Sequence, residues 1–303
     1  MDRAASPAPV QRVPAAGWPA LAGFIWRHNR ALDGGVRCLH FEQGDSVEQH
    51  ARELSQLPAA DAAFWMAAGP DGSAQAVAGC EFDPVLGRAW LRGPLVGDRE
   101  TEPVLAPMLL HALEQGLPQL SCFDAFPSEA DPALNALYEA AGYRRIDVHR
   151  VLRAPLQGMV LDADPRVHPG VPENLPGLLA LHHRLFPSSY LKDADIADAL
   201  ADPERLVRVV HESGSVAGYL VAQHEPDADE VYVDYLGVDE SRRGSGLGRA
   251  LVQSAMRWGR ALGRGHAALT VRQDRLPALS LYRRCGFAQI SAGVQWRKER
   301  IPA

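Results

Sequence analysis

The sequence predicts a mixed α/β (α+β) protein made of two copies of one arrangement of strands and helices. Segments with the periodicity of strands and of helices follow one another in nearly the same order twice. Matching words also occupy matching places: "VAG" at 77–79 returns at 216–218, and "NALYEAAGY" at 135–143 is answered by "LSLYRRCGF" at 279–287. Because the offset stays at about 140 residues, we interpret the pattern as an internal repeat.

The first copy is expected to begin with two helices, the second of them capped by Ser46. Two apolar stretches then flank "PDGS", which is typical of a hairpin turn. The helices are expected at 19–32, 46–57, 102–116 and 132–143, and the strands at 62–69, 74–82, 88–96 and 119–126.

The second copy repeats this order, with the turn "SGS" at 213–215 between its first two strands. Its long helix carries an apolar stripe of Leu247, Leu251, Ala255, Trp258 and Leu262, which is typical of a helix packed on a sheet. The helices are expected at 172–186, 194–202, 246–263 and 277–287, and the strands at 205–212, 216–223, 231–238 and 266–271, with one more after 287.

The boundary between the copies is expected in "APLQGMVLDADPRVHPG" (154–170), whose proline and glycine content suits a linker. The proline- and alanine-rich start of the chain is typical of disorder. We therefore expect a disordered tail at 1–16, a first domain at 17–154 and a second domain at 155–303.

Composition excludes several classes of protein. A net charge of −6 argues against a surface built for nucleic acid or for an anionic membrane. No run approaches the roughly 18 apolar residues of a membrane helix. The four cysteines are far apart, none forms CxxC, and no histidine pair accompanies them at ligand spacing. We expect reduced thiols in a cytoplasmic protein without a metal site.

The stretch "RRGSGLGRAL" (242–251) joins the strand at 231–238 to the long helix. A glycine turn that opens a helix makes an anion site, because the first helical N–H groups lack partners and the helix dipole is positive there. A Walker A loop would need a lysine, and a dinucleotide loop would need a third glycine at 249, where Arg249 stands. From Arg242 to Arg284 the net charge is +9, so the rest of the chain carries −15.

The spacing Arg243-x-x-Gly246-x-Gly248, followed about 35 residues later by "LYRRCGF", resembles the GCN5-related N-acetyltransferase (GNAT) superfamily over about residues 160–298. The resemblance implies two tandem GNAT-like domains, each with a central, mostly antiparallel, twisted sheet flanked by helices. It also implies transfer of an acetyl group from acetyl-CoA to an amine that attacks the thioester directly. By the same resemblance the CoA-binding residues are Leu236, Gly237, Val238, Arg243, Gly244, Ser245, Gly246, Leu247, Gly248, Arg249 and Arg275.

The resemblance also assigns catalytic roles. Tyr282 stands at the family's tyrosine position and is expected to protonate the departing thiolate, although packing against the sheet would also explain it. Asp234 is the candidate base, against the alternative of a salt-bridged strand residue. Strand alternation places it with Tyr232, Leu236 and Val238 on one face, unless a bulge intervenes.

One position departs from the family pattern. Arg275 replaces the asparagine that often precedes the "LY" motif, so a cofactor contact is lost there or becomes an arginine–phosphate contact. His224 and the acids Glu225, Asp227, Asp229 and Glu230 would attract a cationic amine, but a polar hairpin tip is the preferred interpretation.

The first copy lacks the phosphate loop. Thr101 stands where Arg243 stands, and "DRETEPVLAP" at 98–107 has no glycine. We expect this copy to be structural or to shape the acceptor pocket, and shared strand edges would allow an intramolecular pseudo-dimer. The acceptor is expected to be a small-molecule or peptide amine. Two alternatives remain: a non-catalytic sensor or scaffold that binds acyl-CoA, and RNA binding, for which interleaved aromatic residues are missing.

Overall fold

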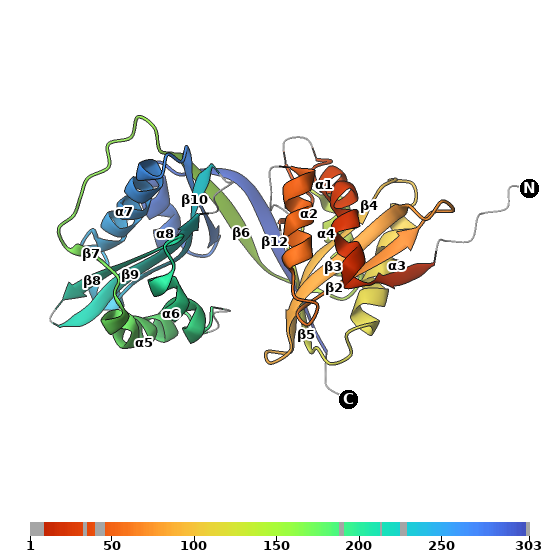
Figure 1. Ribbon diagram of the computed structural model, residues 1–303, viewed down its shortest axis with the longest axis horizontal. Coiled ribbons are helices and arrows are strands. Elements are labelled where there is room, and N and C mark those ends of the chain that lie inside the picture. Colours follow the sequence, from red (N-terminus) through yellow and green to blue (C-terminus); the bar gives the residue numbers. More distant parts are fainter. Residues whose placement is uncertain are drawn as a thin grey trace, which may run out of the picture. The chain divides into compact units, whose positions relative to one another are not determined.

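The computed structural model describes residues 9–32, 35–39, 46–187, 191–212, 214–224 and 229–300. The chain forms two compact units, one of residues Met1–His149 with Ser291–Ala303 and the other of Arg150–Ile290. Both combine one sheet with helices, which confirms the predicted mixed α/β class (Figure 1). Within the described residues no helix is both long and apolar enough to span a membrane.

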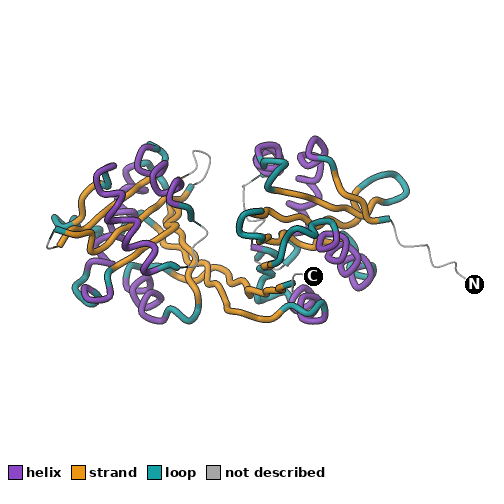
Figure 2. Tube along the Cα trace, turned by 90° about the horizontal axis from the view of Figure 1, so that it is seen from below, coloured by secondary structure: helices purple, strands orange, loops and turns teal. Residues whose placement is uncertain are grey.

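The sheet of the first unit is antiparallel except for one parallel pair, β4–β5. Helices lie on both of its faces (Figure 2). Its strands lie in the order β1 (Val10–Val13), β2 (Ala62–Ala68), β3 (Ala74–Asp83), β4 (Arg88–Val96), β5 (Cys122–Ala125) and β12 (Ala288–Glu299). Its α-helices are α1 (Ala22–Asn29), α2 (Val47–Gln56), α3 (Glu102–Gln115) and α4 (Pro132–Ala140).

The strand β1 corrects the prediction of a disordered tail at 1–16. Val10–Val13 pair with Ala67–Phe64 of β2, and the Val13 side chain is buried in the core. The edge of β2 provides the backbone partners that the proline-rich sequence does not reveal. Residues 1–8 lie outside the described part of the chain.

The sheet of the second unit is also mostly antiparallel, with one parallel pair between β10 and β11. Its strands lie in the order β6 (Arg144–Pro155), β11 (His266–Arg272), β10 (Glu230–Val238), β9 (Ser215–His224), β8 (Arg205–Glu212) and β7 (Val167–Pro169). Its α-helices are α5 (Leu175–Leu185), α6 (Asp193–Ala201), α7 (Leu247–Ala261) and α8 (Leu276–Arg284).

Each face of this second sheet has its own core. The predicted apolar stripe of α7, except the exposed Leu262, packs with side chains of α8 against Val231, Val233 and Leu269. On the other face α5 and α6 pack against Val209, Tyr219 and Val221. Period-2 alternation along the strands produces these two cores, because successive side chains point to opposite faces.

The two units exchange strands relative to the order of the sequence. β12 is the last strand of the chain, yet Trp296–Glu299 pair with β5 of the first unit. β6 follows α4 in the sequence, yet its residues from Arg150 onward belong to the second unit. The predicted division at 154/155 therefore remains a proposal about the repeat, while the compact units of the structure divide the chain differently.

Candidate functional site

The strand β10 has an open backbone edge next to the glycine loop. Its parallel pairing with β11 covers only Glu230–Val233, and ends at the pair Val233–Leu269. β10 continues to Val238 and β11 to Arg272, so the two strands diverge beyond that pair. The backbone N–H and C=O groups of residues 234–238 on this edge are available to an extended ligand that adds as another strand.

A bulge in β10 changes which side chains share a face. The register with β9 shifts between Val233 and Tyr235, so that Asp234 is the extra residue. Asp234 contacts Arg205 and Gln223, while Tyr235 packs in the core of α5 and α6. Leu236 and Val238 pack in the core of α7. The predicted common face of 232, 234, 236 and 238 is therefore wrong beyond Asp234.

The glycine loop has the backbone that an anion site needs. Gly244 and Gly246 have φ of +82° and +85°, a region that side chains with a Cβ rarely adopt. Gly246 is the N-cap of α7, and no side chain caps the first turn. The N–H groups at the start of α7 and the helix dipole therefore offer positive charge to a ligand.

The predicted phosphate-binding arginines have exposed side chains. The side chain of Arg243 is 57% exposed and forms a surface ion pair with Glu240 at 3.2 Å. Arg275 lies at the N-cap of α8 and is 3.5 Å from Asp274, and Arg249 is 3.9 Å from Asp162. Such exposed pairs contribute about 0–1 kcal/mol, so a phosphate can replace the carboxylate at little cost.

The two motifs of the sequence meet at Gly248. A Cβ on Gly248 would lie 3.0 Å from Cδ2 of Leu281, so the missing side chain lets α8 approach the first turn of α7. This contact places the "LY" helix beside the phosphate loop. It also brings Tyr282, the residue after Leu281, to the same end of the sheet.

Tyr282 is 7% exposed and its ring packs edge-on against Phe287. Burial raises the pKa of its phenol further above the ordinary value. No hydrogen bond joins its hydroxyl to another residue in the described part of the chain. The phenol is therefore protonated at neutral pH, and its hydroxyl can donate a hydrogen bond to a ligand.

Asp234 has the environment of a base that works near neutral pH. Its side chain is 11% exposed, and it accepts hydrogen bonds from Arg205 at 3.2 Å and Gln223 at 3.3 Å. Burial raises the pKa of this carboxyl to about 6, against the opposing effect of Arg205. Perturbed carboxyls of this kind are common at functional sites.

His182 is a polar side chain on α5 to which the sequence analysis assigned no functional role. It is 1% exposed, and Nδ1 lies 2.6 Å from the Tyr219 hydroxyl. Its Nε2 atom is buried without a hydrogen-bond partner in the described residues. Tyr219 in turn lies against β10, because a Cβ on Gly237 would be 2.5 Å from Tyr219 Cε1. Leu178 and Leu181 of the same helix are also buried, and this apolar pattern is a sequence signal for the burial of His182.

The described charged residues of the hairpin between β9 and β10 pair with neighbouring segments of the chain. His224 lies 2.8 Å from Glu204, and Asp229 accepts a hydrogen bond from the Gly265 amide at 2.8 Å. Glu230 lies 3.0 Å from Arg153. Glu225 and Asp227 lie outside the described residues. These contacts favour the interpretation of a polar hairpin tip.

The corresponding place in the first unit is filled by the chain itself. Arg37, 2% exposed, contacts Glu102 in the first turn of α3, and its Nε lies 2.6 Å from Asp131, the N-cap of α4. Tyr138, the counterpart of Tyr282, donates a hydrogen bond to the carbonyl of Gly93 on β4. Glu102 supplies the negative charge that a phosphate would supply at a helix N-terminus.

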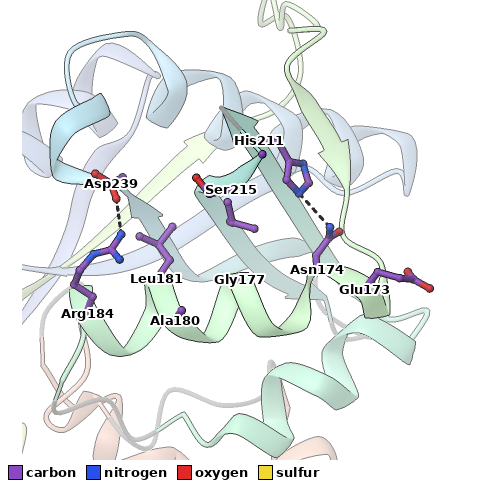
Figure 3. A pocket seen from close by; sticks show the side chains of 11 residues that line it. Glu173, Asn174, Gly177, Ala180, Leu181, Arg184, His211, Ser215 and Asp239 are labelled. Atoms are coloured by element: carbon purple, nitrogen blue, oxygen red, sulfur yellow. Dashed lines mark hydrogen bonds and ion pairs between the residues drawn. The ribbon is translucent and has the colours of Figure 1, made fainter.

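A separate hollow of about 440 Å³ lies between α5 and the β8–β9 hairpin (Figure 3). Two polar pairs line it: Arg184 with Asp239, and Asn174 with His211 at 3.1 Å. Asp239 also accepts a hydrogen bond from the Ser241 amide at 3.0 Å. The contacts of Asp239 therefore link α5 to the start of the phosphate loop.

Metal chemistry has no donor set in the described residues, since no group of three or more His, Cys, Asp or Glu side chains is placed to hold an ion. The cysteines Cys38, Cys80 and Cys285 are buried as free thiols, and Cys122 is partly buried.

The second unit matches a known family. Residues 175–287 match the acetyltransferase (GNAT) family model. A mycothiol acetyltransferase of Clavibacter sepedonicus is 36% identical over 106 residues, which are 35% of this chain and 34% of the relative. The chain thus spans about a third of the length of the curated relatives it matches first.

Solved structures share the fold of nearly the whole chain. The crystal structure of a GCN5-related N-acetyltransferase from Sphaerobacter thermophilus has a TM-score of 0.78 at 21% identity and covers 97% of this chain and 96% of that one. A tandem GNAT protein from the clavulanic acid biosynthesis pathway has a TM-score of 0.69 at 16% identity, covering 97% and 100%. The second unit therefore belongs to the acetyltransferase (GNAT) family, and the chain as a whole has the tandem GNAT fold.

Proposed function

We propose that this protein transfers an acetyl group from acetyl-CoA to an amine acceptor, and that the second unit alone binds acetyl-CoA. The observation that carries the proposal is that three features follow one another along the chain: the open edge of β10, the glycine loop and the start of α7. The open edge of β10 leads to Gly244 and Gly246, whose backbone precedes the uncapped start of α7. An extended pantetheine arm suits the strand edge, and a diphosphate suits the loop.

The residues present fit the phosphates and the pantetheine arm of CoA. The exposed guanidinium groups of Arg243, Arg249 and Arg275 carry the charge that phosphates need. The amides of Ser245, Leu247 and Gly248 are the proposed diphosphate donors. Leu236, Gly237 and Val238 are the proposed backbone partners of the pantetheine arm, with the Val238 amide aimed at the thioester oxygen.

The proposed reaction is a direct attack. The nitrogen of a neutral amine bonds to the thioester carbon, and the carbonyl oxygen takes up negative charge that a backbone N–H stabilises. The C–S bond then breaks, and the sulfur takes its proton from the Tyr282 hydroxyl. Asp234, or a water molecule bound to it, receives the proton that the amine loses, and Tyr282 recovers its proton from solvent.

The acceptor is proposed to approach from the face of α5 and α6. Tyr235 packs in the core on this face, and Asp234 contacts Arg205 of β8 and Gln223 of β9. Leu236 and the open edge of β10, where the pantetheine arm is proposed to bind, directly follow Asp234 and Tyr235 in the strand. A small-molecule or peptide amine is the proposed class of acceptor, and the relative's name supports a small molecule.

Thiol release from acetyl-CoA over a panel of amines tests the proposal. The wild type is expected to release CoA with at least one amine class, and Arg243→Ala to raise the KM for acetyl-CoA. Tight acetyl-CoA binding with no turnover on any amine would instead support a non-catalytic acyl-CoA sensor. Absence of acetyl-CoA binding would reject both readings of the site.

A further inference from the structure

The stretch 156–166, which we call the strap, follows α7 from its end to its beginning. Early in the strap, the carbonyl of Met159 accepts a hydrogen bond from Arg260 at 3.0 Å. Further on, the carbonyl of Asp162 accepts one from Arg257, and its carboxylate lies 3.9 Å from Arg249. The arginines descend toward the start of α7 as the strap proceeds, so the strap runs antiparallel to the helix (Figure 1).

The strap ends by placing Arg166 against the phosphate loop. Its Nη1 lies 3.4 Å from the carbonyl of Ser245, within weak hydrogen-bond distance. Its Nη2 lies 3.9 Å from the position that a Cβ on Gly246 would occupy. Arg166 is thus at the two residues that immediately precede α7, although it is 79 positions from Ser245 in the sequence.

Asp164 fixes the direction of this guanidinium. Arg166 Nε donates to Asp164 Oδ1 at 3.0 Å, and Nη2 donates to Oδ2 at 2.7 Å. The Arg166 amide donates to the same carboxylate at 3.0 Å. An arginine has five N–H donors in a planar fork. Two of these N–H groups donate to Asp164 and one donates to Ser245, so one N–H on each Nη atom remains for a ligand.

The two neighbouring acids are already paired with other arginines. Glu212, the next acid that acts on Arg166, lies 2.9 Å from Arg242. Glu240 pairs with Arg243. The side chain of Arg166 remains 43% exposed. A dianionic diphosphate at the loop would therefore meet a pre-oriented guanidinium with two free donors, a geometry that arginine recognises well.

We propose that Arg166 is a second diphosphate-binding arginine of the acetyl-CoA site, delivered by the strap from outside the glycine loop. The proposal rests on the proposed function and adds a specificity residue to it. Arg166 would contact the diphosphate rather than the 3′-phosphate, because it lies at the loop backbone.

Calorimetric titration with acetyl-CoA tests the proposal and needs no knowledge of the acceptor. Arg166→Ala is expected to raise the Kd roughly tenfold, since a charge-assisted hydrogen bond to a partly exposed phosphate is lost. Arg166→Lys, which keeps the charge, is expected to recover part of the affinity. Arg260→Ala, which removes a strap contact at the far end of α7, is the matched control and should leave the Kd unchanged.

Asp164→Asn separates phosphate binding from simple support of the loop. If Arg166 binds the diphosphate, Asp164→Asn removes the competing carboxylate charge and keeps one acceptor for the guanidinium, so it weakens binding less than Arg166→Ala does. If the pair only holds the loop, Asp164→Asn weakens binding as Arg166→Ala does, and the proposal fails. The proposal also fails if Arg166→Ala and Arg260→Ala weaken binding alike.

A second ligand tests which phosphate is contacted. Arg166→Ala is expected to weaken CoA and 3′-dephospho-CoA by the same factor. Loss of the effect with 3′-dephospho-CoA would place Arg166 at the 3′-phosphate and overturn the assignment. Wild-type affinity in Arg166→Ala, with binding weakened by Arg243→Ala, rejects the inference alone. A wild type that does not bind acetyl-CoA rejects the proposed function as well.

Discussion

The two tyrosines Tyr138 and Tyr282 stand at the same place in the repeat and are expected to respond oppositely to removal of the hydroxyl. Tyr138 is 1% exposed and donates to the carbonyl of Gly93. Tyr138→Phe leaves that carbonyl without its partner, which costs about 1–3 kcal/mol of the free energy of unfolding. For a unit of this size the melting temperature falls by roughly 2–10 °C.

Tyr282 has no comparable bond, so Tyr282→Phe is expected to change stability by less than about 0.5 kcal/mol. If its hydroxyl protonates the thiolate, acetyl transfer falls by roughly 10²–10⁴-fold, which corresponds to about 3–5 kcal/mol of the activation barrier. Tyr138→Phe should leave acetyl transfer intact at temperatures where the protein is folded.

Thermal unfolding and CoA release from acetyl-CoA, measured on both variants with the best amine of the panel, decide between the roles. A Tyr282→Phe protein that keeps both its stability and its turnover would show that this tyrosine only packs against the sheet. The same result with Tyr138→Phe inactive would refute the assignment of catalysis to the second unit.

Three further changes probe the base, the loop and the exchanged strand. Burial raises the pKa of Asp234 to about 6, so the wild-type rate of CoA release should fall about tenfold per pH unit below 6, as the carboxylate takes up a proton, and Asp234→Asn should be slow at every pH. Gly246→Ala forces a Cβ into φ +85°, which costs about 1–2 kcal/mol and should weaken acetyl-CoA in a titration, whereas Gly263→Ala, at φ +75° beyond α7, should leave binding unchanged. Trp296→Ala removes a buried side chain of the first unit; it should cost about 3–5 kcal/mol of stability in urea unfolding, with acetyl-CoA affinity preserved at low urea, and a loss of that affinity would contradict the division into units.

The repeat, the alternating elements and the glycine loop were predictable because each depends on local sequence. Period-2 and period-3.6 patterns predict strands and helices. Gly244 and Gly246 mark backbone that only glycine adopts easily, and their positive φ bears this out. The tandem GNAT fold that the two motifs implied is confirmed by the family match and by the solved structures.

The strand exchange was not predictable, because β6 and β12 occupy equivalent places in the repeat. Before each strand, a glycine and then an aromatic residue follow the end of the helix. The hydrophobic pattern of each strand fits either sheet, so long-range packing determines which sheet each strand joins. The bulge at Asp234 also has no local signature. Alternation without it would have continued the face of Asp234 to Leu236 and Val238, whereas these two residues pack in the core of α7 and Tyr235 packs in the core of α5 and α6.

The placement of Arg166 and of Arg37 depends on tertiary structure in the same way. Arg166 lies in a proline-containing linker, and nothing in that segment indicates its approach to Ser245. Arg37 lies between α1 and α2 in the sequence, and its partners Glu102 and Asp131 are 65 and 94 positions away. Long-range ion pairs of this kind leave no periodicity in a single sequence.

The central claim is that one unit of the two binds acetyl-CoA, through the glycine loop and its arginines. Calorimetric titration of the full chain with acetyl-CoA measures this most directly, because it gives both the affinity and the number of sites. The account predicts one site per chain, weakened by Gly246→Ala and by Arg243→Ala but unaffected by Tyr138→Phe. Two sites per chain, or one site that these loop variants leave unchanged, would contradict it.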